Sequence, residues 1–253
     1  MLIIDPAHEA HDGVARLTAA EIDIIRRGQQ NPPVLKCVIA YLSVGQAASY
    51  REYWQKDWTA HPPDWMGPED PNWKGSFHVK FWGPAWERLL FSDLDLIIDA
   101  GFDGAMLDVV DAGEFWADRT RGNARRATAE RDMADLVIRL ATHARRRKPG
   151  FALLPNGGLT LLRFGDYLDT VDALVREDVW YNADRLNKPA DTAYVLDHIA
   201  PLLAVGKPAF VIDYVSKPKL VDDFYVKARA AGVVPYASVR NLDRLVVNAN
   251  HDP

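Results

Sequence analysis

The chain has 253 residues, of which 48% are hydrophobic and 26% charged, a balance typical of a folded globular domain. Disordered and collagen-like chains are excluded, and the length suits one large α/β domain spanning residues 1–253, with no linker or low-complexity tract. The net charge of −5 argues against a nucleic acid or an anionic membrane as partner.

The N-terminal stretch MLIIDPAHE has no basic segment followed by a long apolar one. The sequence as given therefore predicts neither a signal peptide nor a membrane span. Cys37 is the single cysteine, so it has no partner for an internal disulfide. Because it lies in the apolar run VLKCVIAYL, we expect it to be buried.

Short apolar runs predict seven strands. They lie at 2–5, 38–43, 104–110, 151–156, 171–177, 208–215 and 233–239. The runs are continuously apolar rather than alternating, which indicates strands buried on both faces, as in a parallel sheet covered by helices.

Helical patterns separate the predicted strands. Thr18 and Glu21 form a capping box that opens the first helix, and Pro84 stands at the first position of another. Further helices are expected near 124–148, 190–205 and 219–231, and glycines at 28, 101, 150, 206 and 232 end the helical patterns. This alternation predicts a (β/α)8 TIM-type barrel, with a doubly wound open sheet as the alternative. The sequence lacks the glycine motifs of a Rossmann fold or a P-loop.

Segment 78–82 (HVKFW) is the one candidate strand with alternating polarity. Such a strand is half exposed, so we predict that it belongs to an excursion over the barrel mouth that brings Trp82 towards a ligand. Strand 38–43 would then pair directly with 104–110. The barrel would then be one strand short of eight, and strand 2–5 would leave an unpaired edge facing 233–239.

Four predicted strands end on an acid: Asp5, Asp108, Glu177 and Asp213. The active sites of barrels lie at the carboxyl ends of the strands, and a carboxylate there needs hydrogen-bond partners or a function. One such acid could equally cap the following helix. Four at one rim favour a negatively charged site.

Polar and aromatic residues accompany these acids. Ser43, Asn156 and Tyr214 lie at or near the ends of predicted strands, and seven of the eight tryptophans lie between positions 54 and 116. Hydroxyl, amide and aromatic groups are typical of carbohydrate sites. We expect Trp54, Trp58 and Trp86 to pack in the core, whereas Trp73 and Trp82 are better placed for a ligand.

Other chemistries find little support. The seven histidines show no metal-binding spacing beyond the weak pair His8 and His11, so no metal is predicted, and no serine-nucleophile motif is present. Acid–base catalysis by carboxylates remains, with Asp108 and Glu177 as the pair. Asp111 would either raise the pKa of its neighbour or bind a substrate hydroxyl, or else cap a helix.

The motifs IAYLSVGQAASYREYW, GFDGAMLDVVDAGEFW, LLPNGG, ALVREDVWY, FVIDYV and GVVPYASVRNLD follow one another across nearly the whole chain. Together they resemble glycoside hydrolase family 114, the endo-α-1,4-polygalactosaminidase-like proteins. The resemblance implies a TIM-type barrel that cleaves α-1,4-linked galactosamine-containing polysaccharide, with Asp108 and Glu177 as its catalytic residues. It also implies an extracellular or periplasmic location.

Two features depart from the family pattern. Gln46 stands where the family usually has Glu, and the stretch that usually precedes LIID is lacking. Since the family's first barrel strand would lie in that stretch, the resemblance implies that the barrel lacks its first strand. The first change keeps a hydrogen-bonding amide but removes a charge from the site.

These observations predict an endo-acting glycoside hydrolase that uses two carboxylates and no cofactor. Its polysaccharide substrate is expected to contact Asp5, Tyr41, Ser43, Gln46, Trp82, Asp111, Asn156, Asp213 and Tyr214. The alternative is a non-catalytic carbohydrate-binding barrel that has lost turnover, which the Gln46 change favours. A barrel acting on small phosphorylated metabolites is disfavoured, since SKPK and RNLD follow the last two strands instead of a glycine-rich phosphate loop.

Overall fold

Parallel strands in chain order form the centre of the protein. The computed structural model describes residues 1–10, 13–28 and 34–251. In these residues the parallel strands are β1 (Leu2–Ile4), β4 (Val38–Ser43), β8 (Gly104–Asp108), β9 (Ala152–Pro155), β10 (Leu174–Glu177), β13 (Ala209–Asp213) and β14 (Val234–Ala237). Hydrogen-bonded ladders join β1-β4-β8-β9 and β10-β13-β14, and a parallel bridge between Asn156 and Val175 connects the two groups. The predicted strands are confirmed, and their sequential order is that of a (β/α) barrel.

The seam of this barrel lies between its first and last strands. Within the described ranges, β1 pairs only with β4 and β14 only with β13. The unpaired edge predicted between 2–5 and 233–239 is confirmed. One edge residue of β14, Val234, is 43% exposed.

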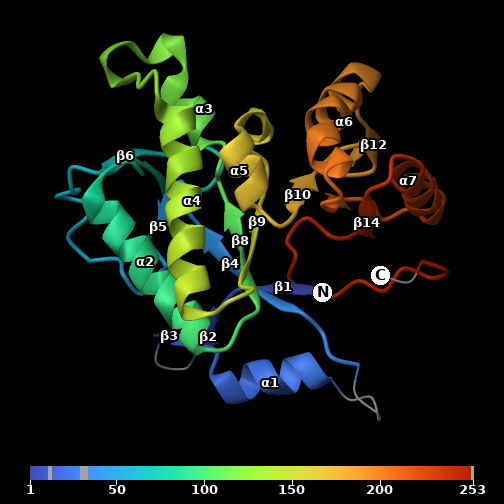
Figure 1. Cartoon of the computed structure of the whole chain (residues 1–253), viewed down its shortest axis with the longest axis horizontal. Helices are drawn as coiled ribbons and strands as arrows, with labels where there is room; N and C mark the ends of the chain where they lie inside the picture. Colours follow the sequence, from blue (N-terminus) through green and yellow to red (C-terminus); the bar gives the residue numbers. More distant parts are fainter. Residues whose placement is uncertain (11–12, 29–33, 252–253) are drawn as a thin grey trace.

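The predicted helices are also confirmed. They are α1 (Ala19–Arg27), α2 (Pro84–Asp99), α4 (Ala129–Arg147), α6 (Pro189–Ala204) and α7 (Pro218–Ala230). Thr18 and Glu21 make the predicted capping box of α1. Helices α2 and α4 lie beside the first strands of the series, and α6 and α7 beside the last ones (Figure 1). Among the described residues, no helix is both long and apolar enough to cross a membrane.

Several shorter elements were not predicted. Helices α3 (Ala112–Ala117) and α5 (Gly165–Thr170) and the 3-10 turns Arg119–Ala124 and Leu159–Arg163 follow strands β8 and β9. Two hairpins, β2 (Ala7–Ala10) with β3 (Gly13–Arg16) and β11 (Tyr181–Asn182) with β12 (Arg185–Leu186), extend from the ends of barrel strands. All of these segments are too short to produce a clear periodic pattern in the sequence.

The segment between β4 and α2 forms a small antiparallel sheet of its own. Strands β5 (Gln46–Ala48), β6 (Met66–Glu69) and β7 (Ser76–Val79) pair in the order β5-β7-β6. Strand β4 pairs directly with β8, from Ile39 opposite Gly104 to Ser43 opposite Asp108. The predicted exclusion of 78–82 from the barrel is therefore confirmed.

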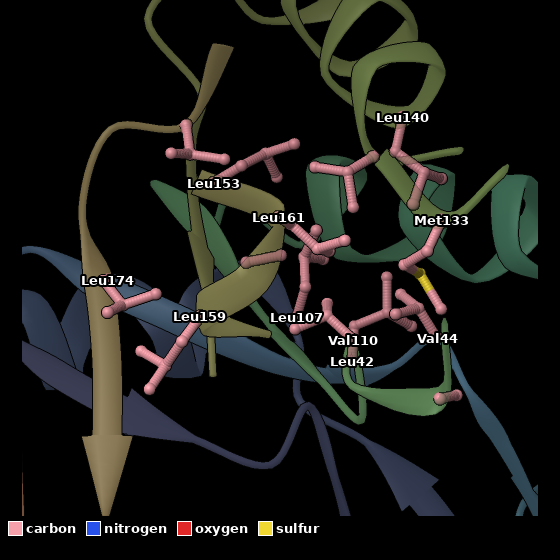
Figure 2. Close-up of a cluster of buried hydrophobic side chains, with 14 of the residues drawn as sticks. Leu42, Val44, Leu107, Val110, Met133, Leu140, Leu153, Leu159, Leu161 and Leu174 are labelled. Carbon is pink, nitrogen blue, oxygen red and sulfur yellow. The ribbon is translucent and has the colours of Figure 1, made fainter. Parts of the chain in front are cut away.

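Alternate residues along each strand face two different cores. One face packs against the helices, where Leu42, Leu107, Leu153 and Leu174 meet side chains of α4 and the 3-10 turn after β9 (Figure 2). The other face fills the barrel interior with Ile39, Met106, Leu154 and Val175, together with the partly buried Ile3, Tyr41, Phe210 and Ile212. The residues that alternate into the barrel interior are therefore also the ones that reach the barrel mouth at the strand ends.

Two expectations about single residues have opposite outcomes. Cys37 is exposed, so the prediction that it is buried is wrong: it lies just before β4 rather than in it. Trp58 and Trp86 are buried at 8% and 0% exposure and stack edge-on or tilted against Trp65, so their predicted packing role is confirmed.

We predict that Trp86→Phe lowers the free energy of unfolding by about 2 kcal/mol, because it leaves a cavity and removes a buried hydrogen bond. The indole Nε1 of Trp86 donates to the carbonyl oxygen of Val44 at 2.9 Å. Urea denaturation followed by circular dichroism measures the change. The matched control is Trp73→Phe, since Trp73 is 62% exposed. Equal stability of the two variants would contradict the proposed role of Trp86.

Candidate active site

Two carboxylates share one amide at the barrel mouth. Asp108 is the last residue of β8, Glu177 the last of β10, and Asn156 follows β9 between them. The Nδ2 of Asn156 donates to Oδ1 of Asp108 at 3.0 Å and to Oε1 of Glu177 at 3.2 Å. All three residues are partly exposed. The ends of three neighbouring strands therefore bring Asp108, Asn156 and Glu177 together, as their predicted positions at strand ends suggested.

The shared nitrogen fixes the spacing of the carboxylates. The two accepting oxygens cannot be more than about 6.2 Å apart, because each lies within 3.2 Å of the same atom. With the two amide hydrogens about 120° apart, their separation is about 5.4 Å. A small molecule could contact both carboxylates at once.

Each carboxylate also has a tyrosine neighbour. The hydroxyl of Tyr41, on β4, donates to Oδ2 of Asp108 at 2.7 Å. The hydroxyl of Tyr214, just after β13, lies beside Glu177, and hydrogen bonding from it lowers the pKa of that carboxyl. Tyr41 and Tyr214 thus contact the two acids, and direct contact of either tyrosine with a substrate stays a prediction.

The backbone turns sharply after each of the three central residues. Val109, Gly157 and Asp178 have φ values of 59°, 76° and 54°. Such angles are unfavourable for a β-branched residue, and strained backbone of this kind concentrates at functional sites. Close approach of Gly45 permits the turn at Val109, since a Cβ at Gly45 would meet the Val109 carbonyl oxygen at 2.1 Å.

The environments of the acids differ. Burial raises the pKa of Glu177, and the charge of Asp108 adds to that effect, while Tyr214 and Asn156 oppose it. Asp111 precedes helix α3 and is exposed to solvent, and it makes no capping hydrogen bond there. Desolvation by the surrounding protein, with the charges of Asp108 and Glu114, raises the pKa of Asp111 to about 6.

Asp213 does not reach the barrel mouth. It is 0% exposed, and its carboxylate accepts hydrogen bonds from the backbone N–H groups of Val179, Trp180 and Tyr181 at 2.7 to 2.9 Å. Burial raises its pKa to about 6 despite these three bonds. Asp213 therefore holds the loop after Glu177 in place of the predicted substrate contact. By the alternation along the strand, its neighbour Tyr214 faces the barrel interior instead.

Three further predicted residues make contacts within the protein. Asp5 forms a bidentate ion pair with Arg51, with both distances 2.7 Å. The hydroxyl of Ser43 donates to the carbonyl oxygen of Gln46 at 3.0 Å. The side chain of Gln46, 8% exposed, donates to Asp70 at 2.7 Å. Their contacts with a substrate stay predictions.

Trp82 packs among aromatic and basic side chains of the protein. Its ring lies edge-on to Phe81 and Trp116, and the guanidinium of Arg126 lies 4.7 Å above it. A role of Trp82 in ligand binding therefore also stays a prediction. In the part of the chain that the structure describes, no group of three or more His, Cys, Asp or Glu residues could hold a metal ion, and His11 lies outside that part.

Sequence reasoning missed Arg51, Asp178 and Arg240. Arg51 lies 5.5 Å from the ring centroid of Tyr41, and Arg240 lies 4.7 Å from that of Tyr214. Arg240 also forms an ion pair with Asp178 at 2.9 Å. Arg51 lies in the excursion ten residues after Tyr41, and Arg240 lies in the loop after β14, 26 residues after Tyr214. Only the position of Asp178 directly after Glu177 offered a signal.

Comparison with known proteins gives consistent results. The model of glycoside-hydrolase family GH114 matches residues 8–252. An uncharacterized protein of Deinococcus radiodurans is 36% identical over 249 residues, covering 98% of this chain and 75% of the relative.

Solved structures share the fold. The glycoside hydrolase domain of PelA from Pseudomonas aeruginosa superposes with a TM-score of 0.69 at 19% identity, covering 92% of this chain and 87% of that one. Aspergillus fumigatus Ega3, solved in complex with galactosamine, gives a TM-score of 0.66 at 18% identity, covering 89% of this chain and 81% of that one.

We predict that Asp213→Asn lowers the free energy of unfolding by about 2–4 kcal/mol, because an amide offers one acceptor oxygen to three buried N–H groups. Thermal and urea unfolding measure the loss. Asp169→Asn is the matched control, since Asp169 is exposed ahead of β10. A stable Asp213→Asn variant with weakened glycan binding would instead support the contact predicted from the sequence.

Proposed function

The chain belongs to glycoside hydrolase family GH114, and on that basis we propose that it cleaves an amino-sugar polysaccharide with Asp108 as nucleophile and Glu177 as acid and base. The single observation that carries this assignment is the bridge from Asn156 to both carboxylates. The chain is thus a glycosidase by family, and its substrate and the roles of its residues are our proposal.

The spacing of the carboxylates supports retention of configuration. Retaining glycosidases hold their carboxyl groups about 5–5.5 Å apart, whereas inverting ones need about 6.5–9.5 Å to admit a water molecule. With ideal amide geometry, the Asp108 and Glu177 oxygens that Asn156 contacts lie about 5.4 Å apart, which agrees with the retaining range.

The surroundings of the two acids support their different roles. Asp108 accepts hydrogen bonds from Tyr41 and Asn156, which stabilise its anionic form. Burial and the charge of Asp108 raise the pKa of Glu177, which favours its protonated form. An ionised nucleophile beside a protonated acid is the state that glycoside cleavage requires.

The reaction then proceeds in two displacements. A carboxylate oxygen of Asp108 attacks the anomeric carbon while Glu177 gives its proton to the leaving glycosidic oxygen, and a covalent glycosyl ester forms. Glu177, now ionised, takes a proton from water as the water oxygen attacks the same carbon. The ester bond breaks, Asp108 leaves as a carboxylate, and Glu177 is protonated again.

The negative charge at the mouth supports a cationic glycan as substrate. Asp111 and Glu114 are exposed near Asp108, and a free amino sugar carries a positive charge at neutral pH. The sequence resemblance to endo-α-1,4-polygalactosaminidases and the fold shared with galactosamine-bound Ega3 agree with α-1,4-linked galactosamine cleaved within the chain.

We predict that Asp108→Asn and Glu177→Gln each lower kcat/KM on a galactosamine polymer at least about 1,000-fold, since each removes a group that acts in both displacements. Sizing of the products measures turnover, and proton NMR of the first product gives its anomeric configuration. We expect the α-anomer from an α-linked substrate.

Both variants should unfold at the wild-type temperature within a few degrees. Near wild-type turnover in Asp108→Asn would remove this residue from the mechanism, and a β-anomeric first product would contradict retention. A wild-type protein that binds the polymer without cleaving it would establish the alternative of a non-catalytic carbohydrate-binding barrel.

We predict that Asp111→Asn weakens binding of a deacetylated galactosamine oligomer about twofold to fivefold at low salt, as for an exposed ion pair. Wild-type binding should strengthen as pH rises through about 6, because the Asp111 carboxyl then becomes charged. The variant should lose much of this dependence. Calorimetric titrations at pH 5 and 7 test it in the catalytically inactive Glu177→Gln background.

Asp169→Asn removes the same charge at the opposite ends of the strands and should bind as before. A fully acetylated oligomer should bind both proteins equally. The proposal would be wrong if the acetylated and deacetylated oligomers bound alike and showed no dependence on salt.

A further inference from the structure

The same arrangement of side chains stands behind each of the two carboxylates. Behind Asp108, the Tyr41 ring has Arg51 beside it, and Asp5 holds Arg51. Behind Glu177, the Tyr214 ring has Arg240 beside it, and Asp178 holds Arg240. Each acid thus meets a tyrosine hydroxyl, and each tyrosine ring meets a guanidinium that an aspartate anchors.

The arrangement at Asp108 is the more rigid of the two. Arg51 makes two hydrogen bonds of 2.7 Å to Asp5, and its side chain is only 15% exposed. Its guanidinium lies 5.5 Å from the Tyr41 centroid and 5.0 Å from that of Tyr50. Asp5 follows β1 and Arg51 follows β5, so this group joins the first barrel strand to the excursion.

The arrangement at Glu177 is more open. Arg240 donates to Oδ2 of Asp178 at 2.9 Å and to Oδ1 of Asn182 at 2.8 Å, and its side chain is 46% exposed. Its guanidinium lies 4.7 Å from the Tyr214 centroid. The loop after β14 is thereby tied to the turn that directly follows Glu177.

A cation near the face of a tyrosine ring withdraws electron density from it. The phenol becomes a stronger hydrogen-bond donor, and a carboxylate that accepts this bond is stabilised in its ionised form. In both groups the arginine acts in this direction, since its charge lowers the pKa of its tyrosine against the larger effect of burial.

We propose that Arg51 and Arg240 are positioning residues that act through Tyr41 and Tyr214 to orient and polarise the two carboxylates of the site. The inference rests on the proposed function for its catalytic consequence. Neither arginine contacts Asp108 or Glu177 in any hydrogen bond or ion pair found among the described residues.

The two groups differ in exposure, and this difference matches the two roles. Arg51 is anchored by two bonds and shielded from water, so its effect on Tyr41 is little screened. Arg240 lies nearer its tyrosine ring, at 4.7 Å against 5.5 Å, but it is half exposed, so solvent and salt screen its charge more. The shielded arginine thus stands behind the proposed nucleophile, and the screened one behind the residue that must exchange a proton in every cycle.

Several titratable groups face each acid, and the test must leave them unchanged. Glu177 faces Asp108 of β8, Tyr214 after β13 and Asp178 of its own turn. Asp108 faces Tyr41 of β4, Glu177 of β10 and Asp111 ahead of α3. Removing an arginine also leaves its aspartate unpaired, which would raise the pKa of the nearby acid further.

The test compares Arg51→Gln and Arg240→Gln by the pH dependence of kcat/KM. The acidic limb reports the nucleophile and the alkaline limb reports the acid. We expect Arg51→Gln to move only the acidic limb and Arg240→Gln only the alkaline limb, each towards higher pH by about half a unit. Arg51→Lys and Arg240→Lys keep the charge and should keep the limbs near their wild-type positions.

Charge-neutral variants separate the effect of the tyrosine from that of the unpaired aspartate. Asp178→Asn/Arg240→Gln should still move the alkaline limb, and the same pair of changes in a Tyr214→Phe background should move it no further. Arg244→Gln is the matched control in the same loop, because Arg244 is exposed and, among the described residues, forms one ion pair, with Asp243 at 3.8 Å. It should leave both limbs in place.

Carbon-13 NMR titration of the Asp108 and Glu177 carboxyls gives a readout that needs no substrate. If the carboxyl titrations shift as expected but the wild type shows no turnover, the proposed function fails and the inference stands. The inference is overturned if the wild type cleaves its substrate while the folded Gln variants titrate like the wild type. This outcome counts whether or not the variants are active. Equal losses of kcat in the Gln and Lys variants with unmoved limbs would also overturn it.

Discussion

The bridge from Asn156 to Asp108 and Glu177 is the interaction on which the rest of the site depends. Two carboxylates about 5.4 Å apart repel each other by roughly 3 kcal/mol at an effective dielectric constant of about 20. The amide of Asn156 offsets part of that repulsion, because its nitrogen end carries two hydrogens and directs one to each acid. The remaining repulsion is relieved when Glu177 is protonated. The contact therefore fixes the distance between the acids, while the repulsion that remains separates their protonation states.

The fold supplies this contact through strand register. Asp108 ends β8, and Asn156 follows β9 and forms a bridge with β10, the strand that ends at Glu177. Because the strands are parallel and adjacent, residues of the same parity lie in one layer at the barrel mouth. The positions of the three residues thus depend on the rigid part of the molecule, whereas Arg51 and Arg240 reach their tyrosines from loops.

Strand parity also explains which parts of the site were predictable from the sequence. A continuously apolar run shows that a strand is buried on both faces, and it placed all seven barrel strands. It does not show which residues face the interior, since Ile39 and Val38 are equally apolar. Asp108 and Glu177 have the inward parity, but Asp213 has the outward one, so the acid that ends β13 bonds to a loop and Tyr214 occupies the mouth.

Contacts between distant segments were beyond a reading of one sequence. The pairing of Tyr41 with Arg51 crosses from β4 to the excursion, and Tyr214 meets Arg240 across the last strand. Cys37 lies within an apolar run but just before β4 begins, and it is exposed. Periodicity describes the elements themselves, so it leaves such interactions unspecified.

The strained turn at Val109 shows how precisely the site is held. A β-branched residue at a φ of 59° costs of the order of 1–3 kcal/mol, and surrounding contacts must hold it there. The N–H of Val44 donates to the carbonyl oxygen of Asp108 at 3.0 Å, and that of Ala112 to Val109 at 3.2 Å. Gly45 leaves room for both strand ends to meet. Because these contacts act on the backbone at the end of β8, they hold the position from which the Asp108 carboxylate meets Tyr41 and Asn156.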